Sequence, residues 1–157
     1  MAGGGPAGGE RGALAASLTL APALVEQLAD HARQAAPREC CGLLTLPPLR
    51  YQPVRNVAAG LNRFEMDPGD LLAVLTDLEE QGGSLWGIFH SHPTHPAAPS
   101  AIDLAEAHYP DAVYLILSLA PAAVPGAGLL LQSAGALRAY RRSGQAWQEL
   151  SLCVVGS

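Results

Sequence analysis

The chain contains no lysine: its nine basic residues are all arginine, and with 14 acidic residues the formal net charge is −5 at pH 7. Proteins that hold nucleic acid by its phosphate backbone normally present a basic face. The sequence therefore predicts no nucleic-acid partner. Aromatic residues are also few, at 5%, whereas hydrophobic residues reach 49%. That content excludes disorder for most of the chain and predicts a core built mainly from Ala, Val, Leu and Ile.

Cysteine is scarce as well, and the three present are the adjacent pair Cys40 and Cys41 and the distant Cys153. An odd number with two neighbours does not form a disulfide framework, and free thiols are typical of a reducing compartment. No uninterrupted apolar run is long enough to span a bilayer, so we expect no membrane partner. Residues 13–24 resemble the apolar part of a signal peptide only weakly, because an acidic residue stands among those before it. We therefore expect a cytoplasmic protein.

The length of 157 residues is that of one domain. Residues 1–16 are rich in Gly and Ala and are expected to form a flexible N-terminal tail, with residues 17–157 as the folded domain. Alternation and apolar periodicity predict the order β-α-β-β-α-β-α followed by four strands. This order indicates a mixed α/β (α+β) fold, a curved mixed sheet flanked by helices. The predicted strands are 17–21, 41–46, 50–57, 85–92, 112–119, 128–132, 137–142 and 146–155, and the predicted helices are 22 to about 37, 67–82 and 100 to about 108.

Four polar residues in a short stretch carry the chemistry. His90 and His92 end a predicted strand, and because successive strand side chains alternate, both imidazoles project from one face. Asp103 follows Ser100 by one helical turn, so its carboxylate can return towards the end of that strand. Two imidazoles and one carboxylate leave a fourth tetrahedral position open, which is the arrangement of a catalytic zinc site.

Each part of this pattern also has an ordinary structural explanation. A histidine pair two residues apart is by itself a weak signal for metal. Ser100 with Asp103 is a good helix N-cap pattern, and the cap and ligand interpretations are compatible. His95, in the loop between the ligands, is expected at the surface but could contact metal or substrate. Cys40 and Cys41 are expected to pack as small apolar residues.

The spacing His90-x-His92, seven residues, Ser100, two residues, Asp103 resembles the signature of the JAMM (MPN-plus) zinc metallopeptidases. That family also carries an upstream glutamate in a segment similar to residues 37–44, where Glu39 stands between a predicted helix and a predicted strand. The resemblance covers about residues 17–155 and includes the family fold, a curved mixed sheet flanked by helices. The long insertions of the eukaryotic deubiquitinating members are missing, so the chain resembles the compact prokaryotic members.

The resemblance implies a role for each residue. His90, His92 and Asp103 would bind Zn²⁺. Glu39, without ligating the metal, would act as general base on the zinc-bound water and later pass the proton to the leaving amine. Ser100 would hydrogen-bond the tetrahedral oxyanion. By pattern alone Glu39 is a solvated residue at a helix-to-strand turn, so its role depends on the family.

The expected function is that of a zinc metallopeptidase, a JAMM-type isopeptidase. It would hydrolyse an amide at the C-terminal tail of a small ubiquitin-like or sulfur-carrier protein. The scissile bond could release an amino acid such as cysteine or could be a lysine isopeptide, and both remain open. Two alternatives are a non-catalytic scaffold of the MPN type and a relative associated with DNA repair. The scaffold is disfavoured because all motif residues are present. The repair relative is disfavoured by the acidic charge and by Ser91, where that relative usually has Asn.

Overall fold

The computed structural model describes residues 17–105, 107–121, 128–131 and 135–154. The predicted N-terminal tail, residues 1–16, lies outside this part of the chain. The elements are β1 (Ser17–Leu20), α1 (Pro22–Ala35), β2 (Cys41–Leu46), β3 (Arg50–Val54), α2 (Pro68–Glu80), β4 (Ser84–His92), α3 (Ala101–Ala105), β5 (Val113–Ser118), β6 (Leu129–Leu130), β7 (Ala136–Ser143) and β8 (Ala146–Val154).

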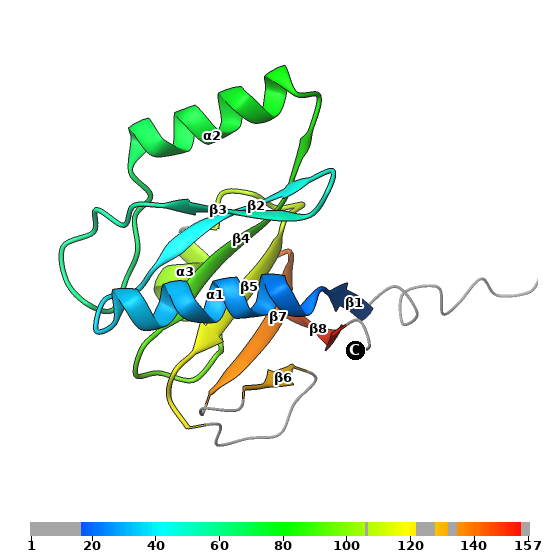
Figure 1. Ribbon diagram of the computed structural model, residues 1–157. Helices are drawn as coiled ribbons and strands as arrows, with labels where there is room; N and C mark the ends of the chain where they lie inside the picture. The colour runs from blue at the N-terminus through cyan, green and yellow to red at the C-terminus, as the bar shows by residue number, and fades with distance from the viewer. Residues whose placement is uncertain (1–16, 106, 122–127, 132–134, 155–157) are drawn as a thin grey trace, which may run out of the picture.

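All the described strands belong to one strongly curved sheet, with the order β1-β8-β7-β5-β4-β2-β3 and β6 paired to β7 (Figure 1). The pairs β1–β8 and β4–β5 are parallel and the others are antiparallel. The mixed sheet and flanking helices confirm the predicted fold class. β5 lies at the centre and is buried along its whole length, as expected for an apolar run covered on both faces.

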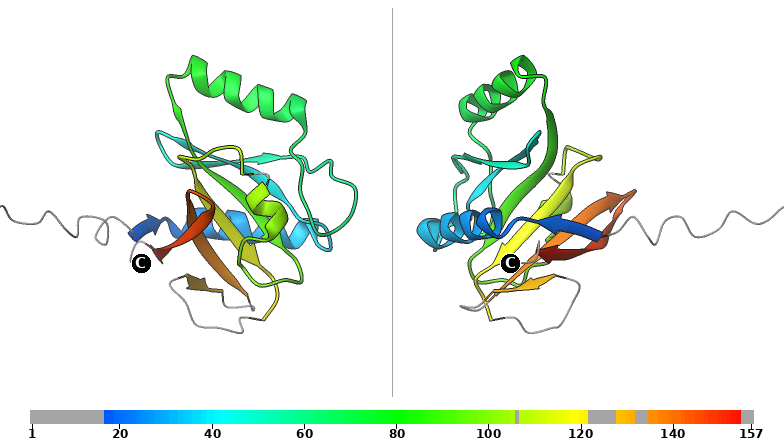
Figure 2. Two further views of the ribbon diagram at one scale, coloured as in Figure 1. Left: turned by 180° about the vertical axis from the view of Figure 1, so that it is seen from behind. Right: turned by 45° about the vertical axis from the view of Figure 1, so that its right-hand side comes forward.

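The two faces of the sheet carry separate hydrophobic clusters. Helix α1 packs its apolar stripe, including Leu24 and Leu28, against one face, which holds Phe89 of β4. The opposite face carries Ile88 of β4, with α2 packed against part of its cluster. Views from the two sides place α1 and α3 on opposite faces of the sheet (Figure 2). Because strand side chains alternate, Ile88, His90 and His92 share the face that α1 does not cover.

Three predicted elements are shorter than expected. The strand predicted over 50–57 ends at Val54, and Asn56 makes only an isolated bridge to Met66. The helix predicted from Ser100 to about His108 covers Ala101–Ala105. His108 therefore lies beyond the helix. Of the strand predicted over 128–132, Leu129–Leu130 form β6, and position 132 lies outside the described residues.

None of the helices in the described residues has the length and apolar character needed to cross a membrane.

Candidate active site

The two histidines of the motif lie at the end of β4 and face each other. Their Nε2 atoms are 3.1 Å apart, and both residues are almost completely buried. β4 holds them rigidly because it pairs with β2 on one side and with β5 on the other, in register from His90 opposite Ile116 to His92 opposite Ser118. Two imidazoles thus converge on one point from a central strand.

Asp103 reaches the same point from α3. Its Oδ2 lies 3.2 Å from Nε2 of His90 and 3.3 Å from Nε2 of His92. The side chain is fixed by a reciprocal cap: the Ser100 amide donates to Asp103 Oδ2 at 2.8 Å, and the Asp103 amide donates to Ser100 Oγ at 3.0 Å. This is the geometry of a capping box, so the cap interpretation of Ser100 is confirmed, and the cap also aims the carboxylate at the histidines.

These three donor atoms fit a tetrahedral metal. Ligand atoms held at about 2.0–2.1 Å from a tetrahedral ion lie about 3.3–3.4 Å from one another. The distances of 3.1, 3.2 and 3.3 Å among His90, His92 and Asp103 are close to those edges. Glu39 also has a carboxylate oxygen within 4.8 Å of both imidazole ligand atoms, so Glu39, His90 and His92 form a second group able to hold a metal. The shorter edges favour Asp103 over Glu39 as the third candidate ligand.

A backbone carbonyl sets the tautomer of His92, and an aromatic ring covers His90. Nδ1 of His92 lies 2.8 Å from the carbonyl of Pro96, so it carries the proton and donates, which leaves Nε2 with a lone pair for metal. The ring of Phe64 stacks on His90 at a centroid distance of 4.6 Å and an interplanar angle of 27°. Nδ1 of His90 is buried and has no hydrogen-bond partner among the described residues.

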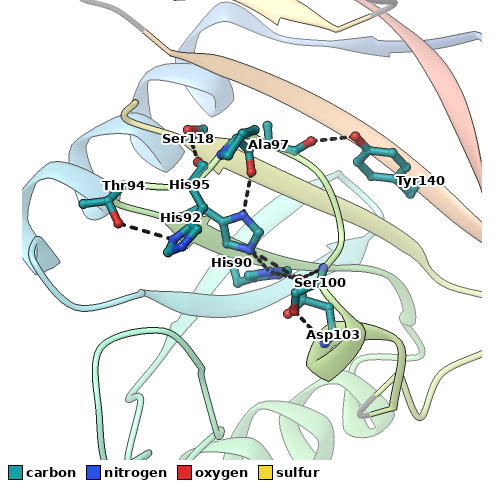
Figure 3. A network of polar contacts seen from close by, with 10 residues as sticks. His90, His92, Thr94, His95, Ala97, Ser100, Asp103, Ser118 and Tyr140 are labelled. Atoms are coloured by element: carbon teal, nitrogen blue, oxygen red, sulfur yellow. Dashed lines mark hydrogen bonds and ion pairs between the residues drawn. The ribbon is translucent and has the colours of Figure 1, made fainter. Parts of the chain in front are cut away.

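The loop that joins β4 to α3 is anchored at three successive carbonyls (Figure 3). The hydroxyl of Ser118 donates to His95 O, the imidazole of His92 to Pro96 O, and the hydroxyl of Tyr140 to Ala97 O. The loop is therefore attached to β4, β5 and β7 together. Sequence reasoning missed Ser118 and Tyr140, because nothing local marks a residue on a later strand as the support of an earlier loop.

Glu39 lies just before β2 and is buried, with 5% of its surface exposed. Its Oε1 is buried and has no hydrogen-bond partner among the described residues. Burial raises the pKa of Glu39 to about 7, against the opposing attraction of His92 and with a further rise from Asp103. A solvated position at the turn, the ordinary interpretation of the sequence, is therefore wrong for Glu39.

The other three titratable groups respond differently to burial. Burial raises the pKa of Asp103, but hydrogen bonds from His90 and His92 outweigh it and hold the pKa well below its ordinary value. Burial lowers the pKa of His90. For His92 burial also lowers the pKa, yet its bonds to Asp103 and to the Pro96 carbonyl give a net rise. Asp103 is therefore ionised at neutral pH, whereas Glu39 is the carboxyl whose pKa lies close to neutral pH.

A cavity of about 320 Å³ opens beside these residues. We call it the site cavity, and its lining consists of Glu39, Asn62, His92, His95, Pro96, Ala98, Ser100 and Ile102. The base predicted from the family and the serine predicted for the oxyanion thus share a single cavity with one of the histidines. His95 is exposed at its wall.

The thiols near Glu39 are inert by position. Cys40 and Cys41 are buried, and burial is the largest of the causes that raise their pKa values, to about 11 and about 12. They remain thiols at neutral pH and pack as apolar residues, as predicted.

The family model of the prokaryotic homologues of the JAB domain matches residues 21–129 of the chain. The chain belongs to this family. The suspected JAMM resemblance is confirmed.

Relatives within the family support the same conclusion. The chain is 32% identical over 147 residues to a desampylase of Haloferax volcanii, a match that covers 87% of this chain and 96% of the relative. It is 34% identical over 100 residues to the CysO-cysteine peptidase of Mycobacterium tuberculosis, covering 60% of this chain and 68% of the relative. Because these relatives are named as a desampylase and a peptidase, the JAB chain is a hydrolase of the JAMM type.

Two solved structures share the fold of this JAB chain. A protein from Desulfitobacterium hafniense superposes with a TM-score of 0.73 at 31% identity, covering 88% of this chain and 93% of that one. A JAB1/MPN domain protein from Archaeoglobus fulgidus has a TM-score of 0.53 at 19% identity, covering 88% and 100%, which concerns the fold alone.

Proposed function

We propose that this JAB chain is a zinc-dependent peptidase or isopeptidase that hydrolyses an amide at the C-terminal tail of a small ubiquitin-like or sulfur-carrier protein. The observation that carries the proposal is the set of three donor atoms on His90, His92 and Asp103, at 3.1–3.3 Å from one another, beside the buried carboxyl of Glu39. The names of the desampylase and of the CysO-cysteine peptidase support cleavage of a bond to a small protein.

His90, His92 and Asp103 would hold the ion through two imidazole nitrogens and one carboxylate oxygen. When bound, zinc supplies a Lewis acid that polarises the scissile carbonyl and lowers the pKa of a coordinated water to about 7. Asp103 is suited to this role because its side chain is already held by the backbone of Ser100. The bond from His92 to Pro96 O holds the imidazole in the orientation that binding needs.

Glu39 would act as the general base and then as the general acid. Its carboxylate accepts a proton from the attacking water and delivers that proton to the nitrogen of the leaving amine. In the metal-free protein burial raises the pKa of Glu39 from 4.5 to about 7, so the carboxyl takes up a proton at neutral pH more readily than an exposed glutamate does. Its Oε1 has no competing partner among the described residues, which leaves it free for that water.

Ser100 would stabilise the oxyanion of the tetrahedral intermediate. Its Oγ accepts the Asp103 amide, but the hydroxyl proton is not used by the cap and can donate into the site cavity. Capping and oxyanion stabilisation therefore use different parts of one hydroxyl.

The three free cysteines support a reducing compartment, and a cytoplasmic location is part of the same proposal.

The test is cleavage by the purified chain of two substrates that share one ubiquitin-like body ending in Gly-Gly. One substrate carries a single amino acid after the tail and the other carries a lysine isopeptide, so mass spectrometry of the products separates the two open reactions. We expect about one zinc per chain, cleavage of at least one substrate, and loss of cleavage after chelation.

Glu39→Gln is the decisive variant. We expect it to keep its zinc and to lose about 10²–10⁴ in kcat, the usual contribution of a general base. Glu26→Gln, which makes the same change on the exposed surface of α1, serves as the control and should retain wild-type activity. A zinc-free protein that cleaves neither substrate would favour the scaffold, and a Glu39→Gln variant as fast as wild type would remove Glu39 from the reaction.

A further inference from the structure

One peptide group next to Glu39 is held entirely by side chains from other segments. The carbonyl of Glu39 accepts a hydrogen bond from Asn56 Nδ2 at 2.9 Å, and the amide of Cys40 in the same peptide group donates to Ser91 Oγ at 2.9 Å. β2 begins only at Cys41, so this group lies outside its ladder. A buried peptide group outside a ladder needs such partners, and here they fix the direction in which Glu39 leaves the backbone.

Asn56 uses its whole carboxamide. Besides the bond to Glu39 O, its Nδ2 donates to Arg63 O at 3.2 Å, and its Oδ1 accepts the amides of Ala58 at 2.9 Å and Glu65 at 3.0 Å. Two donors and two acceptors are the full capacity of an asparagine side chain. Fully satisfied networks of this kind hold one arrangement of the segments that they join.

The segment tied down by Asn56 reaches the site in two places. Phe64 lies between the two bonded groups, Arg63 O and Glu65 N, and stacks on His90 at 4.6 Å. Asn62 lines the site cavity together with Ser100 and Ile102. We call residues 57–65 the wall segment. The amide of Val57 donates to Glu65 O at 2.8 Å, and this bond joins the two ends of the wall segment.

We propose that Asn56 is a positioning residue of the reaction: its carboxamide holds the backbone of Glu39 and the wall segment in one arrangement, so that base, His90 and cavity wall stay aligned on the substrate amide. The inference rests on the proposed function of Glu39 as the base. Asn56 touches neither substrate nor metal ligand in this scheme and acts through Glu39 and through Phe64.

Two substitutions distinguish the bond of Asn56 to the Glu39 backbone from its bonds to the wall segment. Asn56→Asp keeps the acceptor for the amides of Ala58 and Glu65 but replaces the donor to Glu39 O and Arg63 O by a second oxygen. The wall segment then keeps two of its three bonds to residue 56, whereas Glu39 loses its only one. Asn56→Ala removes both links. Gln148→Glu, the same amide-to-carboxylate change on an exposed part of β8, is the matched control.

For Asn56→Asp we expect a fall in kcat of about 10–10², the usual cost of losing a partner that orients a catalytic group, with KM within about twofold of wild type. For Asn56→Ala we expect the same fall together with a raised KM. Zinc content should be unchanged in both variants, and Gln148→Glu should behave as wild type. Wild-type kcat in Asn56→Asp would overturn the proposal.

A double-mutant cycle shows whether the effect passes through Glu39. In a Glu39→Gln background, Asn56→Asp should cost no more than about a further twofold in kcat, because residues that act as a unit are not additive. A full second loss in that background would overturn the proposal while leaving Glu39 as the base. A Glu39→Gln variant with wild-type activity would instead contradict the proposed function.

Hydrogen exchange tests the hydrogen bonds of Asn56 independently of any measurement of enzymatic activity. In the wild-type protein the two Nδ2 protons of Asn56 and the amides of Ala58 and Glu65 should be protected. Asn56→Asp should leave the two amides protected, and Asn56→Ala should make them exchange at least tenfold faster. Unprotected Nδ2 protons in the wild type would overturn the proposal even if neither variant folds.

Discussion

The amide of Ser100 and the Oδ2 atom of Asp103 form a hydrogen bond of 2.8 Å, and the same Oδ2 lies 3.2 Å from His90 and 3.3 Å from His92. One oxygen is thus shared between a helix cap and the candidate metal centre. Because the bond comes from the backbone amide of Ser100, the hold on the carboxylate does not depend on the serine hydroxyl.

Ser100→Ala should separate the cap hydroxyl from the metal ligand. We expect zinc to be retained, because the Ser100 amide still holds Asp103. The free energy of unfolding should fall by about 1 kcal/mol through the lost cap, and kcat should fall by about 10²–10³ through the lost oxyanion donor. Chemical denaturation, metal analysis and steady-state kinetics measure the three effects. Ser100→Thr keeps a hydroxyl and should recover most of the stability, and a zinc-free Ser100→Ala protein would contradict the geometry.

His92→Ala should abolish both metal binding and cleavage. The substitution removes one of three donors and also the bond to Pro96 O that anchors the loop. Metal analysis after gel filtration, with cleavage assayed in parallel, tests this expectation. His108→Ala, which removes an exposed imidazole outside the candidate ligands, should keep about one zinc per chain and wild-type activity. Full activity without His92 would exclude it as a ligand.

The buried carboxyl of Glu39 should make the metal-free protein less stable as the pH rises. Its pKa is about 7 in the folded state against 4.5 for the ordinary group, so the folded state binds the proton more tightly than the unfolded state does. The stability contributed by this group is complete below about pH 4.5 and is lost as the pH rises to about 7. Chelated Glu39→Gln should therefore melt at a higher temperature than chelated wild type at pH 8.

The higher melting temperature of Glu39→Gln should disappear below about pH 4.5, because there the wild-type carboxyl is protonated in both the folded and the unfolded state. Thermal melts of the two chelated proteins across this pH range give the difference directly. Glu26→Gln on the exposed surface should show no such dependence. An equal melting temperature for Glu39→Gln and wild type at pH 8 would mean that Glu39 is solvated.

Thiol labelling should distinguish one cysteine from the other two. Cys153 is exposed on β8, whereas Cys40 and Cys41 are buried with pKa values raised to about 11 and about 12. A maleimide at pH 7 should label the native protein once and the denatured protein three times, as mass spectrometry will show. Native Cys153→Ser should remain unlabelled. Labelling of that variant would mean that the start of β2 opens easily.

The sequence by itself determined the order of the elements and the local half of the site. His90 and His92 share a face because of strand periodicity, and Ser100 with Asp103 forms a cap because one helical turn separates them. These relationships involve residues at most thirteen positions apart, so local geometry specifies them. The buried central strand, β5, was equally readable from its uninterrupted apolar run.

Only the tertiary structure decided how the distant residues meet the motif. Glu39 is 51 positions before His90, and its burial and raised pKa exist because β2 pairs with β4 in one particular register. Asn56 and Tyr140 carry no local mark, yet one holds the backbone of Glu39 and the other holds Ala97 of the loop. Such hydrogen bonds satisfy polar groups that become buried only when the sheet has formed, so a linear pattern cannot contain them.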